Sequence, residues 1–402
     1  MVISLKDEFS SLIDENYKSV IRQIISVARQ MNIKIYLIGG IVRDLILKTP
    51  IKDVDITVEG NAIDFCINLQ NKFDCKIIAK QDNLKTAKVE FLPGIIIDFA
   101  STREEIYPKK GALPVIQNIG CNLKLDIKRR DFTINTLAIE LCDEQKYLLV
   151  DYFDGYNDIL NKKIRILHEK SFMDDPSRII RALKFQMRLG FDIETSTKIL
   201  MDEYLKNVDK AFPLERIKNE LSQYFSINKS DIYNNLIQIK AYKLITDNPI
   251  LNFNMKNYLR IKPYINSQNY QFVYFAHLLI NSDFENQRLN LSASEKKILF
   301  EVNELLKNHK FNDNISIYNA YKNKQEYTPI IYYVITGDES VLKFYSELKD
   351  IKVLINGHDL INMGLKPSAY FNELFQKILE EKLNGNLQTK KEEIEFVKEI
   401  IL

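Results

Sequence analysis

Two aspartates separated by one residue carry the strongest chemical signal in the sequence. Asp53 and Asp55 lie in the segment KDVDI (52–56), and the longer run KDVDITVEG alternates with the period of a β-strand. Residues two apart on a strand point to one face, so the two carboxylates are predicted to lie side by side. Such carboxylates repel unless a cation lies between them, and two Mg²⁺ ions there would suit attack of a hydroxyl on a triphosphate. A solvated strand edge is the alternative interpretation.

A third carboxylate, Asp98, lies in the segment GIIIDFA (94–100), whose run of isoleucines predicts another strand. It is a second-tier candidate for a ligand of the same metal ions. A turn residue at the end of a strand is an equally good interpretation.

A glycine pair precedes the two aspartates in the segment IGGIVRD (38–44). An apolar strand that runs into Gly39 and Gly40 and then into a helix would bring bare backbone and amide donors close to a phosphate. Arg43, a short step into that helix, could pair with a triphosphate. A tight turn between a strand and a helix is the alternative.

A basic segment with one acid and one amide follows at KRRDFTIN (128–135). Arg130 could contact phosphate, and Asp131 could accept a hydrogen bond from a ribose hydroxyl. Asp131 and Asn135 are four residues apart, so on a helix they would share one face. A solvated run of charges is the alternative.

The segment DDPSRIIRALKFQMRLGF (174–191) predicts an amphipathic helix with Asp175 as its N-cap and Pro176 as its first residue. One face would carry polar groups able to form hydrogen bonds with the edge of a base. A simple cap followed by a solvated basic face is the alternative. The predicted polar face comprises Asp175, Arg178, Arg181, Lys184 and Arg188, and the opposite apolar face comprises Ile179, Ile180, Leu183 and Met187.

The elements that would position these residues change in type along the chain. The first third mixes strand and helix patterns, with strands expected near 33–38, 75–80 and 94–100 and in the segment AKVEFLP (87–93). From about residue 150 amphipathic helices dominate. The predicted fold class is therefore α+β, with an N-terminal α/β part around a small mixed sheet and an all-helical remainder.

Composition excludes several classes of protein. A net charge of +2 over 402 residues leaves nucleic-acid binding open, because phosphate contacts depend on local clusters of Lys and Arg. No apolar run approaches the roughly 20 residues of a membrane span, and the N-terminus does not resemble a signal peptide. We therefore expect a cytoplasmic protein without a membrane partner, and the sequence does not indicate its oligomeric state. No zinc site or HD phosphohydrolase motif is expected from the spacing of Cys66, Cys75, Cys121, Cys142, His168, His277, His309 and His358.

Taken together and in this order, the four motifs resemble the family of class II tRNA nucleotidyltransferases and bacterial poly(A) polymerases. The segment PLERIKNEL (213–221) is a softer match to a helical signature of that family. The resemblance implies a polymerase-beta-like nucleotidyltransferase head over residues 1–145. A helical neck that selects the base would follow over 146–225, and a helical body and tail that bind tRNA over 226–402.

The resemblance also implies a role for each matching residue. Asp53 and Asp55 would bind Mg²⁺, while Gly39, Gly40 and Arg43 would hold the phosphates of the nucleotide. The nucleotide would also contact Arg130, Asp131 and Asn135. Asp175 and Arg178 would pair with the incoming cytosine or adenine, with support from Arg181. The substrates would be CTP, ATP or both, together with the 3′ end of tRNA.

One departure from the family pattern concerns Lys184, where the family usually has arginine. Lysine keeps the charge but loses the planar, bidentate fork, which leaves the role of Lys184 in doubt. Between Asp98 and Lys128 the family has a loop that helps the site change from C to A selection. The corresponding segment here, with Arg103, Lys109, Lys110 and Gly111, shows no obvious deletion, which favours an enzyme able to add A.

Three hypotheses stay open at this point. The leading one is an enzyme that adds all of CCA, or only CC or only A, to tRNA. A poly(A) polymerase that acts on RNA 3′ ends shares all four motifs. A catalytically inactive RNA-binding protein is the third, and the retained pair of repelling carboxylates argues against it.

Overall fold

The structure is a computed structural model that describes residues 3–51, 53–108, 114–142, 147–209, 212–265, 270–282, 289–307, 311 and 313–401. Two compact units make up the chain. Unit 1 comprises Met1–Ile227 and Ile239–Leu244, and unit 2 comprises Asn228–Gln238 and Ile245–Leu402. Each unit is described separately below.

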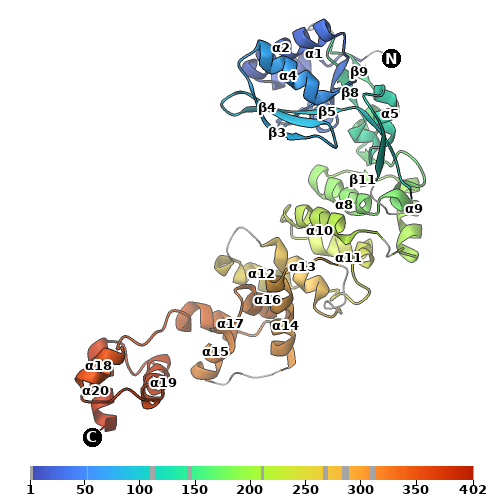
Figure 1. The fold of residues 1–402 in the computed structure, drawn as a ribbon. Coiled ribbons are helices and arrows are strands. Elements are labelled where there is room, and N and C mark those ends of the chain that lie inside the picture. Colours follow the sequence, from blue (N-terminus) through green and yellow to red (C-terminus); the bar gives the residue numbers. More distant parts are fainter. Residues whose placement is uncertain are drawn as a thin grey trace. The chain divides into compact units, whose positions relative to one another are not determined.

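A seven-stranded mixed sheet forms the centre of the N-terminal part of unit 1 (Figure 1). Its strand order is β3-β4-β5-β2-β1-β8-β9, in which β2 and β5 are parallel and all other neighbours are antiparallel. The strands are β1 (Ile35–Ile38), β2 (Val54–Val58), β3 (Lys76–Gln81), β4 (Thr86–Leu92), β5 (Ile95–Ser101), β8 (Ala138–Glu140) and β9 (Leu149–Val150). Two-stranded sheets are formed by β6 (Arg103–Ile106) with β7 (Val115–Ile119) and by β10 (Lys163–Ile164) with β11 (Asp192–Ile193).

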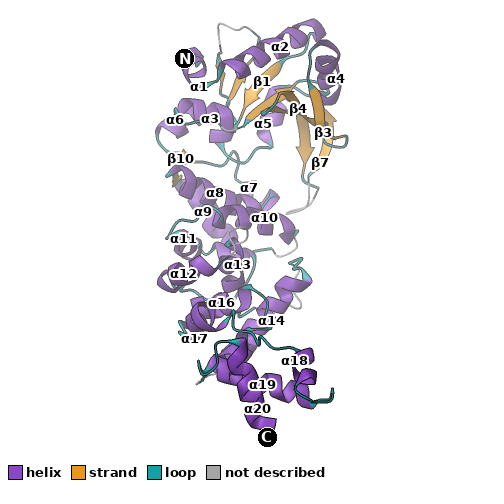
Figure 2. Cartoon of the chain, turned by 90° about the vertical axis from the view of Figure 1, so that its left-hand side faces the viewer, coloured by secondary structure: helices purple, strands orange, loops and turns teal. Residues whose placement is uncertain are grey.

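Alternating burial along the strands shows why this sheet forms. In β5, Ile95, Ile97 and Phe99 are buried, whereas Ile96 is exposed. Helix α4 (Ala62–Lys72) packs against β3, β4 and β5, and α2 (Glu15–Met31) packs against α4 (Figure 2). Burial of these apolar side chains is the main favourable contribution to folding of this layer.

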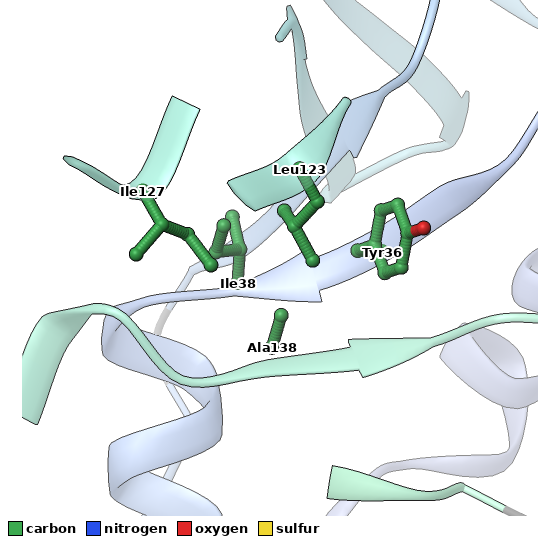
Figure 3. Packing of buried hydrophobic residues seen from close by; sticks show 5 residues of the cluster. All are labelled: Tyr36, Ile38, Leu123, Ile127 and Ala138. Carbon is green, nitrogen blue, oxygen red and sulfur yellow. The ribbon is translucent and has the colours of Figure 1, made fainter. Parts of the chain in front are cut away.

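Another part of the core lies beside β1 and β8 (Figure 3). Helix α5 (Leu123–Lys128) contributes Leu123 and Ile127, which pack with Tyr36 and Ile38 of β1 and Ala138 of β8. This contact fixes the end of α5 that leads into the basic segment 128–135.

The remaining helices of unit 1 lie before, between and after these strands. Helix α8 packs against α10 and carries its apolar face inward, because Ile179, Ile180, Leu183 and Met187 are all buried. These helices are α1 (Lys6–Leu12), α3 (Gly40–Ile46), α6 (Gly155–Leu160), α7 (Ser171–Asp174), α8 (Ser177–Leu189), α9 (Thr195–Lys206) and α10 (Leu214–Phe225). Short 3₁₀ helices cover Thr133–Asn135 and Ala241–Leu244.

The described residues of unit 2 form helices and loops and no strand. Its α-helices are α11 (Ile232–Gln238), α12 (Met255–Ile261), α13 (Gln271–Leu279), α14 (Ala293–Lys307), α15 (Asn314–Tyr321), α16 (Tyr327–Thr336), α17 (Ser340–Lys343), α18 (Gly357–Asn362), α19 (Tyr370–Leu383) and α20 (Lys390–Ile401). A 3₁₀ helix covers Lys262–Tyr264 and a π-helix covers Phe344–Leu348. The C-terminal helices α18 to α20 share a core of Ile355, Leu360, Leu374, Ile378 and Val397.

The predicted change from an α/β part with a mixed sheet to a helical remainder is confirmed. None of the helices in the described ranges is both long enough and apolar enough to cross a bilayer.

Candidate active site

The predicted site residues converge on one cavity of about 860 Å³ within unit 1. All of them line this cavity except Lys184, although the first and the last of the four motifs are more than a hundred positions apart in the sequence. The lining includes Gly39, Gly40, Arg43, Asp53, Asp55, Asp98, Arg130, Asp131, Asn135, Asp175, Arg178 and Arg181.

The acidic wall of the cavity is formed where β2 runs beside β5. Asp55 lies directly opposite Asp98 in the register of these strands, and Asp98 lies opposite Lys88 of β4. Asp53, the residue before β2, lines the same cavity. Lys88 donates to Asp98 with a distance of 2.8 Å between Nζ and Oδ2. Asp53 and Asp55 therefore share one side of the sheet, as the alternating pattern predicts, whereas Asp98 is tied to a lysine.

The carboxyl of Asp55 lies in a setting that disfavours its negative charge. Burial raises its pKa above the ordinary value, and the neighbouring charges of Asp98 and Asp53 raise it further. A divalent cation between such carboxylates would relieve both effects, and oxygen donors are the ligands that Mg²⁺ prefers. The part of the chain that the structure describes contains no group of three or more His, Cys, Asp or Glu side chains that could hold a metal ion. The fitting donors are therefore the pair Asp53 and Asp55, with Asp98 beside them.

Gly39 directly follows β1 and has a backbone conformation that residues with a side chain rarely adopt. Its φ is 75° and its ψ is −120°. A Cβ there would come within 3.3 Å of Nη1 of Arg130. The N–H of Gly39 donates to the carbonyl of Leu137, so it is not free to contact a ligand. The glycine thus makes room for Arg130 beside the turn.

A buried chain of hydrogen bonds joins several of the residues that were predicted to contact the nucleotide. Arg43 is 4% exposed, is paired with Asp44, and donates from Nη1 to Oδ1 of Asn135 at 2.8 Å. The amide nitrogen of Asn135 donates to Oδ1 of Asp131 at 3.0 Å, and Oδ2 of Asp131 accepts from Arg181 at 2.6 Å. Burial opposes the charge of Asp131, but Arg181 and Asn135 outweigh it and lower the pKa of this carboxyl. These residues couple α3 to α8 across the cavity.

The backbone between Asp131 and Asn135 is not the α-helix that would place them on one face. Helix α5 ends at Lys128, and Phe132 is extended and forms a bridge with Ile166. A 3₁₀ turn over Thr133–Asn135 then returns Asn135 to the carboxylate of Asp131. Phe132 is completely buried and packs edge to face against Phe185 of α8.

A second buried carboxylate, Asp126, anchors the basic segment. Its oxygens accept from Arg129 at 2.7 Å and from Arg130 at 3.1 Å, and Asp126 is fully buried. Burial alone would raise the pKa of Asp126, but the charges of Arg130 and Arg129 lower it below the ordinary value. Arg130 is thereby held at the cavity, and its Nε is buried with no hydrogen-bond partner among the described residues.

Another part of the cavity lining is built around Asp175. Helix α8 begins at Ser177, one residue later than predicted, yet Oδ1 of Asp175 still accepts from the N–H of Ser177 at 3.1 Å. Oδ2 of Asp175 accepts from Nη2 of Arg216 on α10. Arg178 is 3% exposed and donates to Ser171 Oγ at 2.7 Å and to the carbonyl of Arg129 at 2.8 Å.

Lys184 is the predicted residue that the structure places outside the cavity. Its ammonium donates to Glu220 at 2.6 Å and to Gln223 at 2.7 Å, both on α10. Glu220 also accepts from Arg181 at 2.9 Å. Lys184 therefore acts in this structure as a tie between α8 and α10.

Sequence reasoning did not single out several side chains that line the cavity, among them Lys88, Tyr107 and Arg216. Tyr107 lies 5.9 Å from the guanidinium of Arg178, measured from the ring centre. Arg216 lies within the softer motif PLERIKNEL, so a signal for it was present. Lys109, Lys110 and Gly111 of the predicted loop lie outside the described residues, as does Lys52.

Comparison with known proteins gives a family match over the part of unit 1 that holds three of the four motifs. The poly A polymerase head domain matches residues 35–165. The A-adding tRNA nucleotidyltransferase of Geobacter sulfurreducens is 40% identical over 188 residues, which are 47% of this chain but only 21% of that protein. The A-adding tRNA nucleotidyltransferase of Halalkalibacterium halodurans is 27% identical, and the match covers 98% of this chain and 95% of that protein.

Solved structures resemble the whole chain. An apo form of a CCA-adding enzyme aligns with a TM-score of 0.84 at 27% identity and covers 99% of both chains. A Thermotoga maritima CCA-adding enzyme complexed with tRNA aligns with a TM-score of 0.77 at 26% identity and covers all of both chains.

Proposed function

We propose that this chain, which belongs to the family of tRNA nucleotidyltransferases and poly(A) polymerases, transfers nucleotides from CTP, ATP or both to the 3′ end of tRNA. The resemblance predicted from the four motifs is confirmed. The names of the relatives support the substrate, because they include A-adding tRNA nucleotidyltransferases and a CCA-adding enzyme complexed with tRNA.

One observation carries the proposal. A single cavity is lined by the carboxylate pair Asp53 and Asp55, by several arginines, and by a further carboxylate, Asp175, that lies just before α8. Such an arrangement offers a place for a metal-bound triphosphate and a separate place for a base.

The metal in this proposal is Mg²⁺, held by Asp53 and Asp55, with Asp98 as a neighbouring carboxylate. Bound there, Mg²⁺ would supply two-metal chemistry, that is, activation of the RNA 3′-hydroxyl and neutralisation of the triphosphate and the departing pyrophosphate. The protein's own contribution is to fix Asp55 on β2, which is paired with β5, and Asp53 directly before that strand.

The basic residues would bind and orient the nucleotide. Arg130, set by Asp126 and by the space at Gly39, is placed to contact phosphate next to the acidic wall. Gly40 and Arg43 belong to the same phosphate end in this proposal. Asp131 and Asn135 are hydrogen-bonded to each other, so they would act on the ribose mainly by holding neighbouring side chains in place.

The base would lie at the end of the cavity formed by Asp175 and Arg178, with Arg181 in support. An acceptor beside a donor complements cytosine and adenine, which both present an amino group next to a ring nitrogen. In this proposal residues 1–145 catalyse, 146–225 select the base, and 226–402 bind tRNA by shape and phosphate contacts in the cytoplasm.

Transcripts of one tRNA that end before CCA, after the first C and after CC distinguish the possible activities. Each is incubated with CTP, ATP or both, and an unrelated RNA is the control. Extension restricted to tRNA supports the proposal, and the accepted ends show whether the enzyme adds CCA, CC or only A. Long A tracts on every RNA would instead identify a poly(A) polymerase, the alternative that the name of the head domain favours.

A further inference from the structure

The cavity extends past the acidic wall, across the outer strands of the sheet. The registers of β2, β5, β4 and β3 place two rows of residues across this face. The first row is Asp55, Asp98, Lys88 and Ala79, and the second is Thr57, Ala100, Thr86 and Gln81. All of them line the cavity. Because residues in register lie on one face of a sheet, the two rows form a continuous surface that begins at the carboxylates.

Lys88 sets the charge of this surface on the side away from Asp55. The second row carries no charge. In the first row Lys88 neutralises Asp98, since its Nζ lies 2.8 Å from Oδ2. An ammonium has three donors, and the side chain of Lys88 is 52% exposed, so it can donate to a ligand and keep the ion pair. A phosphate on this side of the carboxylates would therefore meet a cation rather than an unpaired acid.

The order of the strands separates this surface from the part of the cavity proposed to hold the triphosphate. Strand β2 lies between β1 and β5, and a Cβ on Gly39, the residue after β1, would come within 3.3 Å of Arg130. The proposed triphosphate contacts thus lie on the β1 side of Asp55. In phosphoryl transfer the attacking and leaving oxygens are roughly in line, so the RNA hydroxyl must arrive opposite the departing pyrophosphate. The outer strands β5, β4 and β3 are on that side.

We propose that the surface of β5, β4 and β3 is the subsite for the 3′-terminal nucleotide of the RNA, and that Lys88 binds the phosphate of that nucleotide. This inference rests on the proposed function and gives its second substrate a place. Lys88 is bound to Asp98, and β5 lies about 4.8 Å from β2, so its ammonium is about one strand spacing from Asp55. One nucleotide spans that interval, with its 3′-hydroxyl at the carboxylates and its phosphate at Lys88.

The test pairs a change in the protein with a change in the RNA. A tRNA that the wild-type protein extends is made in two versions, which differ only in the last internucleotide linkage, a phosphodiester or an uncharged methylphosphonate. The kcat/KM for each tRNA is measured at saturating nucleotide and Mg²⁺.

Lys88→Gln should lower kcat/KM for the phosphodiester tRNA roughly tenfold or more, the usual effect of losing a hydrogen bond between charged groups. The wild-type protein should lose about as much on the methylphosphonate tRNA. The variant should lose little further on that tRNA, because the two changes remove the same contact and their effects are not additive.

Two more variants separate this contact from a general effect on the sheet. Lys88→Arg keeps a cation and should stay sensitive to the methylphosphonate. Lys76→Gln removes a lysine of β3 that is not part of the cavity lining, and it should behave as the wild-type protein. The KM for the nucleoside triphosphate should be the same in all of these proteins.

Other roles of Lys88 make different predictions. If Lys88 only neutralises Asp98, Lys88→Gln slows both tRNAs by the same factor. If Lys88 binds the nucleoside triphosphate, the KM for that substrate rises. Either result would overturn the inference. A wild-type protein that extends no tRNA would instead overturn the proposed function, so the two failures are distinguishable.

Discussion

Replacement of Gly39 by alanine perturbs the cavity through a single methyl group. With φ of 75° and ψ of −120°, Gly39 lies outside every region that alanine populates easily, which costs about 1–2 kcal/mol or more. The added Cβ also meets Nη1 of Arg130 at 3.3 Å, so that guanidinium must move by a few tenths of an ångström. Because Arg130 is bound to the buried Asp126, it has little freedom to move without losing this pair.

We expect Gly39→Ala to lose about 2 kcal/mol of stability in unit 1 and to slow nucleotide transfer roughly tenfold or more, since small misplacements in a site are costly. Thermal unfolding followed by circular dichroism and a transfer assay at saturating nucleotide measure the two effects. Gly94→Ala is the matched control, because Gly94 also has a positive φ of 85° but has nothing within 4 Å of the position of a Cβ. It should lose stability and keep activity. Full activity in Gly39→Ala, or equal losses in both variants, would refute the reasoning.

Three further predictions concern buried polar groups. Burial lowers the pKa of His277 from 6.5 to about 4, so between these pH values the unfolded chain binds more protons than the folded one. The free energy of unfolding of unit 2 should therefore fall by about 3 kcal/mol as the pH drops through that window. His277→Leu should flatten the dependence of Tm on pH. Glu393→Ala should lower the free energy of unfolding by about 3–5 kcal/mol and speed hydrogen exchange in α18–α20, because the buried Lys382 would lose its partner. Lys382→Met should have a smaller effect on both, and equal exchange rates in the two variants would contradict this. Arg178→Ala should reduce the preference for CTP and ATP and also lower the stability of unit 1, since four contacts of its side chain to the protein disappear. A variant of unchanged stability and unchanged preference would show that Arg178 does not hold this part of the cavity in place.

Local pattern is sufficient to predict the acidic wall. The alternation around Asp53 and Asp55 predicts both the strand and the shared face, and each depends only on the period of a β-strand. The apolar face of α8 is predictable for the same kind of reason, because its spacing follows the helical period.

Contacts between distant segments are what the sequence could not predict. A helical projection groups Arg178 with the exposed basic residues, yet α7 and the carbonyl of Arg129 cover it. Asp131 and Asn135 reach each other through a 3₁₀ turn that follows the extended, buried Phe132. The partner of Asp175 on α10 is likewise fixed only when two helices pack together, which no local pattern records.

The role of the carboxylate pair is tested most directly by the single-turnover rate of nucleotide transfer to tRNA by Asp55→Asn, an almost isosteric change, with Mg²⁺ supplied. We expect a fall of roughly 10³-fold or more, because charge stabilisation by bound metal contributes several kcal/mol. Binding of tRNA and the Tm should stay close to those of the unaltered protein. A rate within a few-fold of the unaltered protein would contradict the assignment of the carboxylate pair. An unaltered protein that binds tRNA but transfers no nucleotide would identify an RNA-binding protein without catalysis.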